Sequence, residues 1–428
     1  MAAVQDPTRP DRGDSPQQRA RHASRGVPPP RPVRPAVDRG RGRLGRVTTG
    51  QLVAWQVAAA LALLGLSTDR WWHWVGVGLA GVIVVLTLTP VGGRWLHQMI
   101  AMRWRFWWRV PRQVVDPQVD PRLAPLRELL PDLDVLAAEG RGGEQLGIVS
   151  DSQSWVALVA VYGDDDELLP RQAATPRLPV RDLADVLSVD DIRLAGVQVL
   201  LHTVPAPSGL LAGRIGTATS YQQLSAGLVP AAQLVWVALR LDPALCPDAV
   251  AARGGGQDGV HRALRRCVAR TTEVLESAGI RSRGLAAEEV RAALATSAGV
   301  APRRAPATDT RHTGEDWRGW TCDGVVHNTF WLRGWPADVS RGIAALTERL
   351  VNLPVLFTTL SLTLMPGSGD RVRFQAMVRI SAVSAEAARQ VGSALHKAMS
   401  ALGFRVERMD GEQAPAALAT MPIGGAAR

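Results

Sequence analysis

Four consecutive acidic residues, Asp164 to Glu167, are the best candidates for metal chemistry in this sequence. They follow an apolar run that reads as a strand, and paired carboxylates such as Asp164 and Asp166 suit hard divalent cations. A membrane-anchored, metal-dependent transferase acting on nucleotide-sugars is therefore one hypothesis. The same run also suits a solvated turn between a strand and a helix. Nothing downstream resembles a sugar or base pocket, so the turn is the favoured interpretation.

Other chemistries have weaker support. Glycines 254–256 precede a long helix, where backbone N–H groups could bind an anion, but the Lys and Ser/Thr of a nucleotide loop are missing. There is no G-x-S-x-G elbow, and the eight histidines form no HExxH pair. Cys246, Cys267 and Cys322 are far apart in sequence, which favours buried thiols over a zinc site. We expect no catalytic residue and no cofactor.

A tryptophan-rich segment, residues 315–336, is the candidate partner surface. Alternation along its strand places His327, Thr329 and Trp331 on one face, and residues 328, 330 and 332 on the other. Core packing is one interpretation. The other is an interface, because Trp and Arg concentrate at binding hot spots. The candidate residues are Trp317, Trp320, Trp331 and Trp335.

Two charge-free apolar runs dominate the N-terminal third and predict a transmembrane hairpin, with helices at about 51–68 and 74–91. Each run has roughly 18 residues and would extend about 27 Å as a helix. Gly76, Gly78 and Gly81 are candidates for close packing against partner helices. No charged residue lies inside either run, so a pore is not expected.

Aromatic and basic residues flank these runs. The candidate interface tryptophans are Trp71, Trp72, Trp74, Trp95, Trp104, Trp107 and Trp108. The arginines that set topology are Arg41, Arg43, Arg46, Arg94, Arg103 and Arg105. Since the loop between the runs has only Arg70, both termini and the domain that follows are expected in the cytoplasm, with the hairpin in the inner membrane.

The net charge of +10 is uneven, because residues 1–50 alone carry +7. The rest of the chain is nearly neutral, which argues against nucleic-acid binding. Residues 1–46 have almost no large apolar side chains, so they are expected to be a disordered tail. Its arginines could contact anionic lipid or could only enforce topology.

After a Pro-rich linker, the pattern changes to short strands and helices, which predicts an α+β domain. The order strand, helix, strand, strand, helix, strand occurs between residues 155 and 285 and again between 325 and 409. Two tandem ferredoxin-like halves are therefore predicted, with a chance match of alternating patterns as the alternative. The expected parts are the tail 1–46, the hairpin 47–93, an amphipathic segment and linker 94–125, a first half 126–298, a loop 299–314 and a second half 315–428.

Several stretches together resemble the EccE family of type VII secretion systems. They are WQ at 55–56, VALRLDP at 237–243, ARGGG at 252–256, EDWRGW at 315–320, FWLRGWP at 330–336, FTTLSLTLMP at 357–366 and DGEQAPAALATMPIGG at 410–425. The closing ATMPIGG departs conservatively from the ATLPLGG-like ending of that family. No single motif is very specific, and their order and extent carry the resemblance.

The resemblance implies a non-catalytic structural subunit of an inner-membrane secretion complex in actinobacteria. Its partners would be subunits of the EccB, EccC and EccD type, together with membrane lipid. The EccC ATPase would supply the energy. Neither nucleic acid nor a small-molecule substrate is expected.

Overall fold

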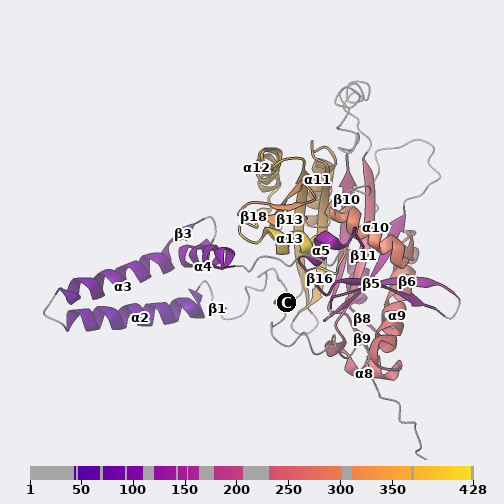
Figure 1. Cartoon of the computed structure of the whole chain (residues 1–428), viewed down its shortest axis with the longest axis horizontal. Helices are drawn as coiled ribbons and strands as arrows, with labels where there is room; N and C mark the ends of the chain where they lie inside the picture. Colours follow the sequence, from indigo (N-terminus) through magenta and orange to yellow (C-terminus); the bar gives the residue numbers. More distant parts are fainter. Residues whose placement is uncertain are drawn as a thin grey trace, which may run out of the picture. The chain divides into compact units, whose positions relative to one another are not determined.

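The structure is a computed structural model that describes residues 43–44, 47–67, 71–91, 94–108, 120–140, 143–151, 153–162, 178–205, 231–300, 311–367 and 371–425. These residues form an N-terminal helical hairpin and an α+β domain built on one large antiparallel sheet (Figure 1).

The hairpin consists of α2 (Thr49–Leu66) and α3 (Trp72–Leu88), which lie side by side (Figure 1). α2 is rich in Ala and Leu, which are good helix formers, whereas α3 is rich in Val and Gly; neither contains proline. Short flanking elements are β1 (Arg43–Leu44), β2 (Val47–Thr48), β3 (Pro90–Val91), β4 (Arg94–Trp95) and α4 (Leu96–Trp107).

Polar contacts join the two helices at both ends of their seam. At the open end, Gln51 Nε2 donates to the Thr87 carbonyl at 2.8 Å, and Trp55 Nε1 donates to Thr87 Oγ1 at 3.0 Å. Near the turn, His73 Nδ1 donates to the Gly65 carbonyl at 3.1 Å. These polar contacts between α2 and α3 therefore lie along the seam of the hairpin.

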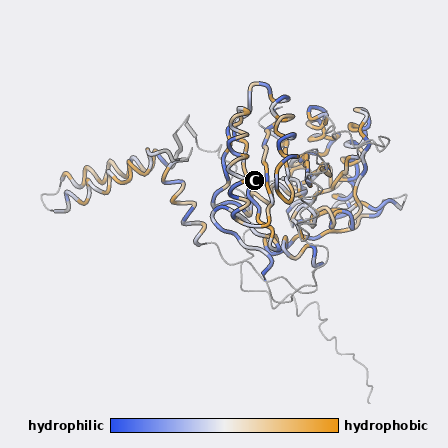
Figure 2. The backbone as a smooth tube through the Cα atoms, turned by 90° about the horizontal axis from the view of Figure 1, so that it is seen from above, coloured by the Kyte–Doolittle hydropathy of each residue, from blue (hydrophilic) through white to orange (hydrophobic). Residues whose placement is uncertain are grey.

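Many large apolar side chains of α2 and α3 are instead exposed, and hydrophobic residues follow the length of both helices (Figure 2). The predicted transmembrane hairpin is nevertheless wrong, because none of the helices in the described ranges combines the length and apolarity of a membrane span. α3 has only 17 residues, about 26 Å, and α2 begins at the polar sequence Thr49-Gly50-Gln51. The predicted orientation, with both termini in the cytoplasm, relied on these two spans and therefore has no basis either.

Substitution of Gly76 should separate the two helices. A Cβ at Gly76 would lie 2.9 Å from Gly65 Cα and from the Leu61 carbonyl, so the Gly76→Val side chain has no room. We expect a loss of about 1–3 kcal/mol, the usual range for overpacking, measured as a lower thermal midpoint of the helical signal. Gly78→Val is the matched control, since a Cβ there meets nothing within 4 Å. Equal effects of the two changes would contradict this seam.

The α+β domain contains a sheet of twelve strands among the described residues. Its main path is β13-β14-β15-β17-β16-β10-β11-β7-β6-β5, while β12 pairs with β7 and β18 with β15. The bounds are β5 Asp134–Glu139, β6 Gln145–Ser150, β7 Trp155–Tyr162, β10 Gly196–Val204, β11 Ala232–Leu241, β12 Arg281–Gly284, β13 Thr313–Glu315, β14 Trp320–Cys322, β15 Val325–Gly334, β16 Phe357–Pro366, β17 Val372–Ala382 and β18 Arg405–Arg408. A small separate ladder joins β8 (Ser188–Val189) and β9 (Ile192–Arg193).

The sheet divides into two halves with the same strand order. In the first, β12 pairs with β7, β7 with β11, and β11 with β10. In the second, β18 pairs with β15, β15 with β17, and β17 with β16. In each case the fourth strand lies beside the first and the third beside the second, which is the order of a split βαβ unit. The halves meet where β10 pairs antiparallel with β16.

Helices cover both faces of this sheet. Face B, the side that carries Val199 and Val378, packs against α6 (Val180–Asp185), α8 (Pro247–Ala252), α9 (Gly256–Ser277), α11 (Val339–Val351) and α12 (Ala385–Ala401). Face A, the side that carries Leu200 and Trp236, packs against α5 (Ala124–Arg127), α10 (Ala287–Ala298) and α13 (Gln413–Ala419). A 3-10 turn, η2 (Pro243–Leu245), links β11 to α8. α10 and α13 follow the last strand of their respective halves, so each half ends with a helix on face A.

Charged side chains close both ends of the strand path. At the β13 end, the Glu128 carboxylate accepts hydrogen bonds from the backbone N–H groups of His312 (2.6 Å) and Thr313 (3.0 Å). At the β5 end, Arg291 donates to the Val135 carbonyl and Arg265 to the Ala138 carbonyl. The backbone groups bound in this way are not open to pairing with another strand, which limits edge-to-edge aggregation at these positions.

Candidate functional site

A row of buried polar side chains crosses the middle of face A. Alternation and register bring these residues to the same side of four neighbouring strands. They are Gln198 and His202 of β10, Thr359, Ser361 and Thr363 of β16, Gln375, Arg379 and Ser381 of β17, and His327 and Thr329 of β15. Because a buried polar group costs free energy unless it is hydrogen-bonded, the free-energy cost of this row depends on the hydrogen bonds that its members make.

Arg379 is the centre of the row and is fully buried. Its guanidinium donates from Nη1 to His327 Nδ1 at 3.1 Å, and from Nη2 to Ser297 Oγ at 3.0 Å and Thr359 Oγ1 at 3.3 Å. The guanidinium carbon also lies 5.7 Å from the centre of the Phe357 ring. These contacts join β15, β16, β17 and the end of α10.

The contacts fix the tautomer of His327. Arg379 can only donate, so Nδ1 of His327 must accept, and the Ser381 hydroxyl, 2.8 Å from the same nitrogen, donates as well. The proton of the neutral ring is then on Nε2, which has no hydrogen-bond partner among the described residues, while the Ala298 backbone lies close enough to act on the ring. His202 continues the chain, with Nδ1 3.0 Å from the Thr359 hydroxyl.

The charge of Arg379 has no carboxylate partner among the described residues. Burial lowers its pKa to about 9, so the guanidinium stays charged at neutral pH. Ser297 and Ala298 belong to the last turn of α10, and the partial negative charge of a helix C-terminus favours a cation there. The α10 terminus is therefore a favourable position for this cation.

Burial also governs the two histidines. It lowers the pKa of His202 to about 3, and that of His327 well below 6.5, with the nearby Arg379 charge acting in the same direction. Both rings are neutral at physiological pH. The described ranges contain no group of His, Cys, Asp or Glu that could hold a metal ion.

The rest of the polar row holds the C-terminal segment, residues 411–425, against the sheet. Gln413 Oε1 accepts from the Thr329 backbone N–H at 2.9 Å. Gln198 Nε2 donates to the Ala419 carbonyl at 2.9 Å. Arg240 Nη1 donates to the Gly425 carbonyl at 3.1 Å while its Nη2 pairs with Asp151. Strands from both halves thus bind this one segment.

The segment is buried on every side. All seven residues of α13 are buried, and Leu418 and Met421 belong to the apolar core of face A. From the β13–β14 hairpin, Glu315 Oε1 accepts from the Ala414 N–H at 2.9 Å, and the Trp317 carbonyl accepts from the Gly411 N–H at 2.7 Å. The tryptophan-rich segment therefore also holds the start of the C-terminal segment.

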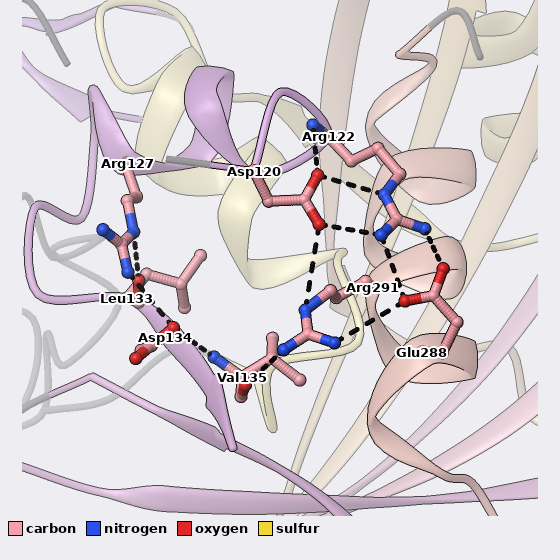
Figure 3. A network of polar contacts seen from close by, with 8 residues as sticks. All are labelled: Asp120, Arg122, Arg127, Leu133, Asp134, Val135, Glu288 and Arg291. Atoms are coloured by element: carbon pink, nitrogen blue, oxygen red, sulfur yellow. Dashed lines mark hydrogen bonds and ion pairs between the residues drawn. The ribbon is translucent and has the colours of Figure 1, made fainter. Parts of the chain in front are cut away.

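Separate polar contacts fix the chain before β5 onto α10 (Figure 3). Arg122 pairs with Asp120 at 2.7 Å and with Glu288 of α10 at 2.5 Å, and Arg291 reaches Asp120 and Glu288 from the next turn. The shared Arg122 holds the pKa of Asp120 and of Glu288 below the usual range, chiefly by hydrogen bonding. The network lies mostly at the surface, so its role is to position the segment that supplies Glu128.

The residues singled out from the sequence lie in different places. Trp320 is fully buried on face A, which places it in the core, while Trp317, Trp331 and Trp335 are half-buried. The three cysteines are free and buried, which confirms the interpretation as buried thiols. Glycines 254–256 all have positive φ and form the turn into α9. Asp164, Asp166, Arg41 and Arg46 lie outside the described residues.

The remaining candidates belong to the hairpin and its flanks. The interface tryptophans Trp71, Trp74, Trp104, Trp107 and Trp108 are exposed, and Trp95 is half-buried. Gly76 contacts Gly65 inside the hairpin, whereas Gly78 and Gly81 have open space beside them. Packing of these glycines against a partner stays a prediction.

Sequence reasoning missed Arg379, Gln198 and Glu128. The signal for Arg379 was its position in the middle of an apolar strand run, AMVRISA at 376–382, where a charged side chain is out of pattern. Gln198 is a similar exception in GVQVLLHTV. Their partners are far away in sequence, so local patterns alone do not identify them.

Comparison with known families gives one match. Residues 229–332 match the family model "EccE: Putative type VII ESX secretion system translocon, EccE". The matched segment runs from β11 through α9 and α10 to β15, and so includes Ser297 and His327 beside the buried arginine. The resemblance to this family predicted from the sequence is thereby confirmed for the matched segment. A search of curated proteins finds no match for the chain.

Proposed function

We propose, from the EccE match over residues 229–332, that this chain is a structural component of a type VII ESX protein secretion system. The match is the observation that carries the proposal. It runs from β11 of the first half to β15 of the second, and the polar side chains beside these strands bind backbone and other protein side chains. Groups engaged in this way hold the fold together, which supports a structural role over a catalytic one.

The partners in this proposal are other subunits of the secretion complex, of the EccB, EccC and EccD type. The exposed apolar side chains of α2 and α3 support one contact, since a large exposed apolar surface marks an interaction site. We assign that surface to apolar helices of another subunit. Gly78 and Gly81 have open space beside them, so a partner helix could approach closely there.

Purification of the tagged chain from its native cells tests both statements. On a native gel the chain should migrate far above 45.9 kDa, together with the ATPase and the other subunits of the same secretion system. Migration as a free monomer or dimer under gentle extraction would contradict the proposal. Gly78→Leu with Gly81→Leu should release the partners without unfolding the α+β domain, whereas Gly314→Leu, also in open space, is the matched control and should not.

A further inference from the structure

The contact between Arg379 and His327 requires that Arg379 donates the hydrogen bond and that His327 accepts it. His327 Nδ1 accepts from the Arg379 guanidinium and from the Ser381 hydroxyl. A proton on Nδ1 would turn this acceptor into a donor and place two cations about 3 Å apart inside the core, where Coulomb repulsion is only weakly screened. The observed geometry is therefore incompatible with a protonated His327.

We propose that this contact is an acid-sensitive latch that keeps α10 and α13 on face A, and that protonation of His327 and His202 releases the C-terminal segment. The positions of the residues at the ends of α10 and α13 support this proposal. Ser297 and Ala298 at the end of α10 contact Arg379 and His327, while Gln413 at the start of α13 binds Thr329, two residues from His327 on the same face. The inference does not depend on the secretion role.

Within the described part of the chain, the other groups around the latch do not supply a compensating anion. From β10 comes neutral His202, which feels the same Arg379 charge. From β14 comes Cys322, whose pKa burial raises well above 9, so the thiol is uncharged. Asp323 and Glu128 act on Cys322 from the edge of the sheet, but each already accepts hydrogen bonds there. β16 contributes Phe357 and the Thr359 hydroxyl, and α13 contributes the neutral Gln413.

The direction of the pH effect follows from the lowered pKa values. Both histidines bind a proton in the released state at about pH 6.5, their ordinary value, but not in the latched state. The latched state is therefore fully favoured above about pH 6.5 and loses stability as the pH falls below it. From pH 7.5 to 5.0, one coupled histidine should raise the equilibrium constant for release about 30-fold, and two about 900-fold.

Hydrogen exchange on the full chain measures this constant. We expect the backbone amides of residues 413–421, corrected for the intrinsic effect of pH on exchange, to lose protection by about 30- to 900-fold between pH 7.5 and 5.0. The amides of α9 on face B are the internal reference and should change far less. Unchanged protection of α13, or an equal loss in α9 and α13, would overturn the proposal, the second because it reports global unfolding.

Two variants test whether His327 is responsible for the pH response of α13. His327→Gln keeps a neutral acceptor and should reduce the pH response of α13 to the single-histidine value, near 30-fold. His396→Gln, at a half-buried position on α12, is the matched control and should retain the full response. If His327→Gln does not fold, the exchange profile of the unmodified chain still decides the proposal. An identical response in both variants would show that His327 is not the sensor.

Discussion

A chain that ends at Asp410 should fail to form the native α+β domain. The truncation removes the whole C-terminal segment, in which Leu418, Met421 and four alanines are almost fully buried. Burial of these side chains is worth on the order of 8 kcal/mol, similar to the total stability of about 5–15 kcal/mol of many domains. It also leaves Gln198, Thr329 and Arg240 without the partners that the segment provides. Thermal unfolding followed by near-UV circular dichroism should show no cooperative transition.

The control for this truncation is a chain that ends at Gly425. Its terminal carboxylate keeps an acceptor oxygen for Arg240 at that position, and the chain should melt like the full chain. A peptide of residues 411–428 added to the shorter chain should restore part of the transition if the remaining groove is intact. A cooperative transition in the shorter chain near that of the full chain would contradict the structural role assigned to the segment.

Glu128→Ala should cost about 3 kcal/mol of unfolding free energy. The Glu128 carboxylate accepts the His312 N–H, the Thr313 N–H and the Thr313 hydroxyl, and an unsatisfied buried donor costs about 1–3 kcal/mol. Glu128→Gln retains one acceptor oxygen and should cost less. Urea unfolding at pH 7 measures both values.

The matched control is Glu273→Ala, which removes a surface pair with Arg270 and should change stability by less than about 0.5 kcal/mol. If Glu128→Ala costs no more than this control, then water satisfies the β13 edge and the carboxylate is dispensable. Increased self-association of Glu128→Ala at unchanged stability would instead indicate that the side chain acts mainly by blocking edge pairing.

Local periodicity predicted much of the α+β domain, because alternation and turn residues act over short distances. The run Trp155–Tyr162 is a strand with those bounds, and the alternation along β15 places Thr329 on face A and Phe330 on face B as expected. β5, β6 and the three face A helices, α5, α10 and α13, were not identified. β5, β6 and α5 are short and α10 is rich in Ala, while α13 has little amphipathic contrast because it is buried on all sides.

The transmembrane prediction failed because it relied on composition. Both apolar runs do form helices, but α3 ends at Leu88, short of the predicted 91. The site could not be predicted for a different reason. Gln198 and Ala419 are 221 residues apart, and only the folded sheet brings them together. The motif DGEQAPAALATMPIGG was informative as a family resemblance, yet nothing in its pattern indicates a helix enclosed within the core.

The position of α13 after both halves of the sheet has a consequence for biosynthesis. Both halves leave the ribosome before the segment that covers face A, since residues 411–425 are translated after every strand of the sheet. Until this segment emerges, the apolar and polar side chains beneath α13 have no cover, and the contact between Gln198 and Ala419 must close across 221 residues. Such long-range closure is slow and exposes the intermediate to aggregation. Nascent chains of this protein should therefore be clients of chaperones until this segment has emerged.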